Sequence, residues 1–239
     1  RTQITFKQLE EESNLIASGL LHYGLKKGDR VLVMVPYGVD FVTLTFGLFK
    51  AGAVPVLIDP GLGKKNVLHC IKQSEPQGII AIPLVHAVKT LIPAPFKSIR
   101  LSVTVGRKWF WRGPTLDQVK RNGQPGYQVG NIPEEQAAAV LFTSGSTGPA
   151  KGVLYTHGMF GQQIRILCEH FGILPGEKDL PTFPLFGLFS TGMGMTSVIP
   201  DMDPTHPAKV NPENIIHPIQ NYHITSSFGS PALWDTVSR

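Results

Sequence analysis

Short apolar runs alternate with amphipathic stretches between residues 28 and 105 of this sequence. The apolar runs have the length of buried strands, and apolar residues at helical spacing separate each run from the next. The first run follows a turn within residues 28–35, and the others span residues 54–58, 78–82 and 99–105. Because strands that alternate with helices build βαβ units, the pattern predicts an α/β fold with a largely parallel sheet covered by helices.

Helix-start signals predict further helices on both sides of this region. Thr5 and Gln8 match a capping box, in which each side chain bonds the other residue's backbone N–H. Thr156 is a good N-cap for a helix from about residue 157 to 171. Near the end of the chain, a helix at 211–222 and a strand at 224–228 are predicted.

Composition limits the classes of protein that need to be considered. The hydrophobic content of 42% and the charged content of 16% are typical of a soluble globular protein. No uncharged apolar run of about 18 residues is present, and no signal segment opens the chain. The two cysteines, Cys70 and Cys168, lack a CxxC partner and fit a reducing cytosol, so a cytoplasmic protein is expected.

No metal site is predicted from the sequence. The histidines are scattered, and none forms a ligand pair with a third ligand nearby. Asp201 and Asp203 stand two apart, as cation ligands sometimes do, but a proline-rich turn explains this spacing better.

A loop rich in glycine and hydroxyl groups, residues 143–151, is the main candidate for chemistry. Short apolar strands are predicted on both sides of it. Small residues let backbone N–H groups approach an anion, and hydroxyl groups add donors. A Walker loop is excluded because Ala150 stands where a glycine is needed and Gly152 follows Lys151. A glycine-rich hairpin loop and a phosphate-binding loop both remain open from the residues alone.

The run from Thr143 to Lys151 resembles the phosphate loop of the adenylate-forming superfamily. This superfamily includes acyl-CoA synthetases, peptide-synthetase adenylation domains and luciferases. Residues 46–60 resemble its second core motif, for which we expect a packing role. Residues 183–204 resemble one branch, the fatty-acid-activating β-lactone synthetases of bacterial olefin biosynthesis.

The resemblance implies an adenylate-forming (acid–thiol) ligase. Such an enzyme would convert a carboxylic acid, here a long-chain fatty or β-hydroxy fatty acid, and ATP into an acyl-adenylate and pyrophosphate. Mg²⁺ would arrive with the nucleotide, and the acyl acceptor would be CoA, a carrier-protein thiol or the substrate's own hydroxyl in lactone closure. Two alternatives stay open: amino-acid adenylation, and a non-catalytic binding or scaffold role.

The resemblance also implies roles for particular residues. Lys151 and Thr147 are the implied catalytic pair. The implied nucleotide-binding residues are Thr143, Ser144, Gly145, Ser146, Thr147, Gly148 and Lys151.

The implied substrate-binding residues are Phe186, Gly187, Gly192 and Gly229. Phe186 holds the aromatic position that faces the acid in the superfamily, and Gly187 stands where histidine is common. With Gly192 nearby, a roomy apolar pocket suited to an acyl chain is expected, with close helix packing as the alternative.

Two further expectations concern partners and domains. Residues 106–113 mix basic and aromatic side chains, but we expect an exposed loop more than a nucleic-acid or lipid site. The motifs that come later in members of the superfamily have no match in this sequence. We therefore expect a fragment of a larger protein, without the superfamily's barrel and C-terminal lid. Its first subdomain would be 26–167, and 1–25 with 168–239 would form a partial second sheet whose open edge invites self-association.

Overall fold

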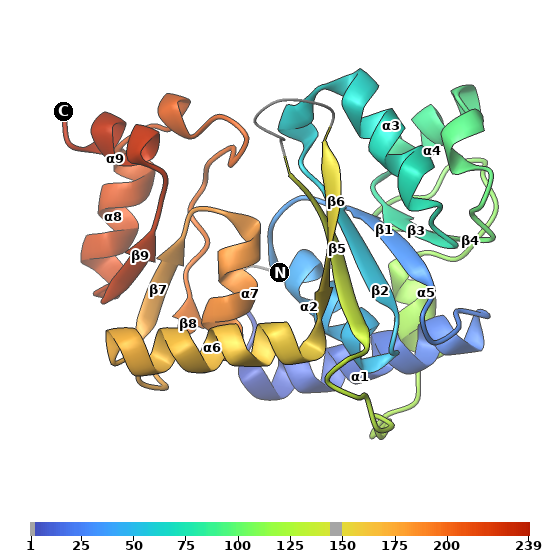
Figure 1. The fold of residues 1–239 in the computed structure, drawn as a ribbon, viewed down its shortest axis with the longest axis horizontal. Coiled ribbons are helices and arrows are strands. Elements are labelled where there is room, and N and C mark those ends of the chain that lie inside the picture. Colours follow the sequence, from blue (N-terminus) through green and yellow to red (C-terminus); the bar gives the residue numbers. More distant parts are fainter. Residues whose placement is uncertain (1–2, 144–149) are drawn as a thin grey trace. The chain divides into compact units, whose positions relative to one another are not determined.

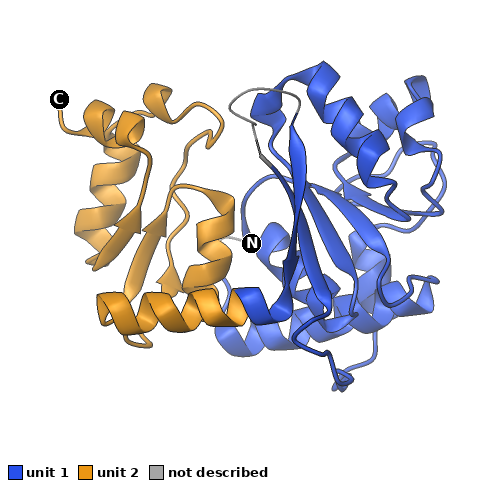
Figure 2. Cartoon of the chain, in the orientation of Figure 1, with its two compact units in different colours: residues 1–159 blue, residues 160–239 orange. Residues whose placement is uncertain are grey.

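The predicted strand–helix alternation is present in the computed structural model (Figure 1), which describes residues 3–143 and 150–239. The chain divides into two compact units, residues 1–159 and 160–239 (Figure 2). Each unit has its own parallel or mostly parallel sheet. The α/β prediction, with one extended sheet and one partial sheet, is therefore confirmed.

Unit 1 contains a six-stranded sheet in the order β4-β3-β1-β2-β5-β6. Strands β1 to β5 are all parallel to one another, and β6 alone is antiparallel, paired with β5. The strands are β1 (Arg30–Met34), β2 (Val54–Ile58), β3 (Gly78–Ala81), β4 (Leu101–Thr104), β5 (Ala137–Thr143) and β6 (Lys151–Thr156).

Helices pack around this sheet, and those that follow β1 connect the parallel strands as crossovers. They are α1 (Phe6–His22), α2 (Val39–Lys50), α3 (Lys64–Ser74), α4 (Pro83–Leu91) and α5 (Leu116–Arg121), with short 3₁₀ turns η1 (Pro60–Leu62) and η2 (Ala94–Phe96). Helix α1 packs against α2 and α5, while α3 and η2 share a core cluster with the strands. The approach of α1 to α5 is close, since a Cβ at Gly19 would lie 2.1 Å from the Val119 carbonyl oxygen.

The predicted caps are present. Gln8 N donates to Thr5 Oγ1 at 3.2 Å, and Thr5 N donates to Gln8 Oε1 at 3.0 Å, which completes the capping box of α1. Thr156 Oγ1 accepts from Met159 N at 3.2 Å at the start of α6 (His157–Phe171). Local signals thus fix where these two helices begin.

Unit 2 holds a three-stranded parallel sheet in the order β8-β7-β9. Its elements are β7 (Lys178–Pro181), α7 (Pro184–Gly192), β8 (Thr196–Ser197), η3 (Pro207–Lys209), α8 (Glu213–Tyr222), β9 (Ser226–Phe228) and α9 (Pro231–Val237). Buried Leu180, Ile215 and Leu233 form its core with Val210. Helix α8 continues past Pro218 to Tyr222.

Asp203 forms the turn that its sequence context predicts. Its Oδ1 accepts from Thr205 N at 2.9 Å and from Thr205 Oγ1 at 2.7 Å. These hydrogen bonds from Thr205, helped by His206, lower the pKa of Asp203 to about 2. The carboxylate is therefore engaged in local structure.

Two broader expectations remain. The assignment of 26–167 to a first subdomain, and of 1–25 with 168–239 to a second, stays a prediction; in this chain α1 belongs to unit 1. Among the helices of the described residues, none has the length and apolar character needed to cross a membrane.

Candidate functional site

The β5–β6 hairpin carries the candidate phosphate loop. Its register places Thr143 opposite Lys151, and Phe142 opposite Gly152. Since β5 runs parallel to β2, its carboxyl end lies at the sheet edge where ligands of open α/β sheets bind. The predicted loop residues Ser144, Gly145, Ser146, Thr147 and Gly148 lie outside the described residues.

Both ends of the loop are anchored in the core of unit 1. Phe142 and Ala150 are 5% and 6% exposed, and both join the core cluster that contains Cys70 and Ile71 of α3. Gly152 leaves room for the Phe142 ring of the facing strand, because a Cβ there would be 3.0 Å from Phe142 Cζ. The loop's two ends are thereby held at a fixed separation.

Lys151 is the described residue best placed to meet an anion at this edge. Its side chain is exposed, and it forms no ion pair with any acidic group in the described part of the chain. An ammonium without an ion-pair partner among the described residues remains available to a phosphate group.

In unit 2, an aromatic stack brings together part of the predicted substrate site. Phe186, on the first turn of α7, stacks on Phe228 at a centroid distance of 3.8 Å and an interplanar angle of 24°. Gly229 follows Phe228 directly, and Gly187 is buried next to Phe186. Phe186, Gly187 and Gly229 therefore lie together at the carboxyl end of β9.

Gly192 lies apart from this group, at the opposite end of α7. A Cβ at Gly192 would lie 2.7 Å from Ile164 Cδ1 of α6. At Gly229, a Cβ would lie 2.7 Å from Trp234 Nε1 and 3.2 Å from Thr182 Oγ1. Both glycines permit close packing within unit 2, and their predicted roles in substrate binding stay predictions.

A buried carboxyl group beside this site was not singled out from the sequence. Ser190 Oγ of α7 donates to Asp179 Oδ2 of β7. Burial raises the pKa of Asp179, and the hydrogen bonds from Ser190 and Ser226 partly offset that rise. The sequence signal was weak, since one Asp in a four-residue strand has no characteristic spacing.

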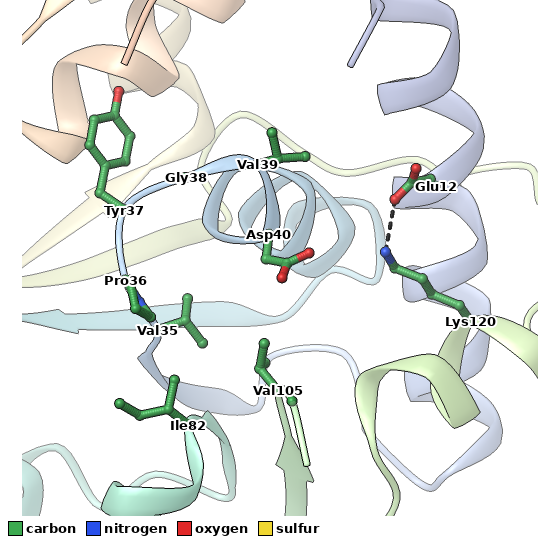
Figure 3. Close-up of a pocket in the computed structure, with 11 residues that line it drawn as sticks. Glu12, Val35, Pro36, Tyr37, Gly38, Val39, Asp40, Ile82, Val105 and Lys120 are labelled. Atoms are coloured by element: carbon green, nitrogen blue, oxygen red, sulfur yellow. Dashed lines mark hydrogen bonds and ion pairs between the residues drawn. The ribbon is translucent and has the colours of Figure 1, made fainter. Parts of the chain in front are cut away.

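Unit 1 also contains a cavity of about 580 Å³ that sequence reasoning missed (Figure 3). It opens at the carboxyl ends of β1, β3 and β4, next to the start of α2. The lining residues are Glu12, Val35, Pro36, Tyr37, Gly38, Val39, Asp40, Ile82, Val105, Gly106 and Lys120.

The cavity has an apolar floor and a charged wall. Val35, Ile82 and Val105 form the floor, while the Asp40 carboxylate and the Glu12–Lys120 ion pair of 2.8 Å lie on the other side (Figure 3). Its position follows from the strand order. Strand β2 lies on one side of β1 and β3 on the other, so the direction in which the sheet is built reverses at β1. Such reversals create crevices, but strand order cannot be read from the sequence.

The profile of the family described as AMP-binding enzyme matches residues 1–239 of this chain. The chain belongs to the AMP-binding enzyme family. The resemblance inferred from the loop and core motifs is therefore confirmed.

Two curated relatives of this AMP-binding chain are named olefin β-lactone synthetase. The protein from Stenotrophomonas maltophilia (strain K279a) is 44% identical over 237 residues, which cover 99% of this chain and 43% of the relative. The protein from Xanthomonas campestris pv. campestris is 45% identical over 232 residues, which cover 96% of this chain and 41% of the relative. The AMP-binding chain thus spans less than half the length of these relatives.

Solved structures share the fold of the AMP-binding chain. A long-chain-fatty-acid-CoA ligase (FadD1) from Archaeoglobus fulgidus superposes with a TM-score of 0.84 and 24% sequence identity. The match covers 98% of this chain and 46% of the ligase. At this identity the likeness concerns the fold alone.

Proposed function

We propose that the protein carrying this chain activates a carboxylic acid with ATP to give an acyl-adenylate and pyrophosphate. The observation that carries the proposal is 44% identity over 99% of the chain to an olefin β-lactone synthetase. We propose a long-chain fatty or β-hydroxy fatty acid as substrate. The chain would contribute the phosphate loop and part of the acyl pocket.

In the proposed reaction, a carboxylate oxygen attacks the α-phosphorus of ATP. The bond from that phosphorus to the bridging oxygen of the β-phosphate breaks, and pyrophosphate leaves. Negative charge grows on the leaving group, so donors fixed around the β- and γ-phosphates lower the barrier. Lys151 would neutralise part of this charge, and Thr147 would donate a hydroxyl hydrogen bond.

The geometry of the hairpin supports this assignment. Thr143 and Lys151 are paired at the mouth of the loop, and the buried Phe142 and Ala150 hold its ends. Preorganised donors need little rearrangement during the reaction, which is the main source of electrostatic catalysis. The backbone of Gly145 and Gly148 and the hydroxyls of Ser144 and Ser146 complete the proposed cradle.

Mg²⁺ would reach the site with the nucleotide, where it would neutralise phosphate charge. Within the described ranges, no cluster of three or more His, Cys, Asp and Glu side chains could hold a metal ion. We therefore assign no protein ligand to it among the described residues.

For the acid, we propose that Phe186, Gly187 and Gly229 lie beside the acyl group and that Gly192 shapes the packing behind α7. Phe186 stacked on Phe228 offers an apolar wall of the kind that lines acyl sites. The second step would transfer the acyl group to CoA or to a carrier-protein thiol, or close a β-lactone.

Carboxylate-dependent exchange between ATP and pyrophosphate, measured on the complete protein and on residues 1–239, tests the proposal. The acids are long-chain fatty, β-hydroxy and amino acids. Exchange with fatty or β-hydroxy acids supports the proposal. Exchange with amino acids alone would assign the protein to amino-acid adenylation, and exchange with none would favour a scaffold role.

A further inference from the structure

The positive charge of this chain is concentrated in one segment. Residues 76–116 contain six Lys and Arg residues and no Asp or Glu. The remainder of the chain holds 16 basic and 17 acidic residues, so the net charge of +5 originates in this segment. A charge excess confined to one region favours an anionic partner at that region.

The segment folds at one edge of the unit 1 sheet, around β4 and α4 (Figure 1). His86 Nε2 lies 3.0 Å from the Val103 oxygen, and Lys89 Nζ donates to Ser102 Oγ at 2.7 Å, which fix α4 on β4. Trp111, in the loop after β4, stacks on His86 with a centroid distance of 5.3 Å. Helix α4 and the loop of residues 107–112 are therefore neighbours.

The loop presents two exposed aromatic side chains on a fixed base. Trp109 and Phe110 are 56% and 75% exposed, whereas Trp111 is 8% exposed. Trp111 Nε1 donates to Thr104 Oγ1 at 2.8 Å, and both neighbouring rings contact Trp111 at centroid distances of 5.4 Å. The apolar tip is thus preformed, so its ordering costs little when it meets a partner.

Helix α4 also exposes aliphatic side chains, on the face turned away from His86 and Lys89. Leu84 and Leu91 are 66% and 81% exposed, and Ile92 directly after the helix is 44% exposed. Leu84 and Leu91 are seven residues apart, so they lie on one face of α4. We call residues 107–112 the aromatic loop.

Cationic groups flank the aromatic tip. Arg107 and Lys108 precede Trp109, and Arg112 follows Trp111. None of the three forms an ion pair with a described acidic group, in contrast to Arg100, which pairs with Asp29. Lys108 Nζ instead donates to the Gly113 carbonyl at 2.8 Å, which stabilises the loop conformation.

Although the sequence alone favours a simple exposed loop, we propose that the aromatic loop docks on an anionic lipid bilayer, with Trp109 and Phe110 entering the headgroup–acyl boundary. Apolar side chains ringed by Lys and Arg bind membrane interfaces through buried area and attraction to anionic headgroups. Arg and Lys extend their charged ends to the phosphates while their stems cover apolar surface. Nucleic acid fits less well, because the unpaired cations are confined to one short loop and no second basic cluster extends a track for a phosphate backbone.

This docking requires neither ATP nor an acid, so its test is separate from that of the proposed function. The complete protein is mixed with vesicles of phosphatidylcholine, or of phosphatidylcholine with about 30% phosphatidylglycerol, and bound protein is separated by flotation. We expect binding to the anionic vesicles, and its loss at about 0.5 M salt, where surface charges are screened. No binding to anionic vesicles would overturn the proposal.

Two double variants and a control locate the binding surface. W109S/F110S should weaken binding at least about tenfold, because two large apolar side chains are removed. R107Q/R112Q should weaken it about 25-fold, at about fivefold for each charge. Phe6→Ser removes a half-exposed aromatic ring from α1 and should leave binding unchanged. Equal binding by W109S/F110S and the native protein would contradict the proposal, as would stronger binding to an oligonucleotide than to the vesicles.

Tryptophan fluorescence gives a second readout that does not depend on the double variants folding. Trp109 should be quenched by acrylamide in the free protein and should shift to shorter wavelength on anionic vesicles. Trp109→Phe should abolish that shift, because Trp111 is already buried. A Trp109 that acrylamide cannot reach in the free complete protein would show that another part covers the surface, and the proposal would fail.

Discussion

Thr143 and Lys151 are cross-strand partners at the loop end of the β5–β6 hairpin. Their pairing places Lys151, eight positions after Thr143 in the sequence, directly across the hairpin from the last residue of β5. In the proposed function, Lys151 contacts the phosphates of ATP. Lys151→Ala should lower ATP–pyrophosphate exchange by roughly 10- to 150-fold, the equivalent of one charge-assisted hydrogen bond. Thermal unfolding should be unchanged, because the Lys151 side chain is exposed.

Lys7→Ala is the matched control for this variant. Lys7 is also exposed, and it lies on α1 with only a 4.0 Å contact to Glu11. Exchange by the Lys7 variant should equal that of the native protein. A Lys151→Ala enzyme that exchanges at the native rate would remove Lys151 from the phosphate site.

The two glycines of unit 2 should respond differently to an added methyl group. At Gly192 the methyl meets the flexible end of Ile164, which can rotate away, so Gly192→Ala should change stability by less than about 1 kcal/mol. At Gly229 it meets the ring of Trp234, so Gly229→Ala should cost about 1–3 kcal/mol. Urea unfolding of both variants measures the difference, and equal costs would contradict this packing.

The sequence predicted most of unit 1 because its local signals agree with each other. The apolar runs became β1 to β4 within a few residues, and the Thr5 and Thr156 caps formed. Each of these elements depends on nearby residues, for which sequence patterns are informative.

Unit 2 was harder to predict because tertiary contacts override local preference there. Pro181 argues against a strand, yet it ends β7 and pairs with Phe228. Gly187 and Gly192 argue against a helix, yet α7 forms with Pro184 at its first position and Phe186 packed on Phe228. The cavity at the ends of β1 and β3 depends on strand order, which no local pattern encodes.

The side chains of Asp179 and Ser190 should be energetically coupled. Ser190→Ala removes a donor from a buried carboxyl group and should cost about 1–3 kcal/mol of unfolding free energy. The same change made in an Asp179→Asn background should cost less, because no charge needs the hydroxyl there. A double-mutant cycle by urea unfolding measures the coupling. Additive costs would show that the two side chains act independently.

The raised pKa of Asp179 also predicts how the free energy of unfolding depends on pH. Its folded pKa is raised by burial, so the folded state holds its proton to higher pH than the unfolded state does. This group therefore adds stability as the pH falls through the folded pKa toward about 3.9, the unfolded value. Comparison of native and Asp179→Asn unfolding free energies across acidic pH isolates this contribution. The variant should lack the added stability at low pH, and identical pH profiles would contradict the assignment.

His86 should change the pH dependence of the unfolding free energy in the direction opposite to Asp179. Burial lowers its pKa, the hydrogen bond to the Val103 carbonyl partly offsets this, and the nearby Lys89 lowers it further. The unfolded chain takes up a proton near pH 6.5 that the folded ring resists, so its contribution to stability is present above about pH 6.5 and is lost below it. Between about pH 5 and 7, the unfolding free energy should rise with pH, and His86→Gln should flatten this slope.

The slope, not the absolute stability, tests the role of His86, because the substitution also disturbs the contact with Trp111. His157, whose pKa burial also lowers, should keep part of the slope in the variant. His170→Gln changes an exposed histidine of α6 and is the control for the loss of one imidazole. An unchanged slope in His86→Gln would mean that the buried ring does not titrate with unfolding. In that case its bond to Val103 and its stacking on Trp111 would account for its whole contribution.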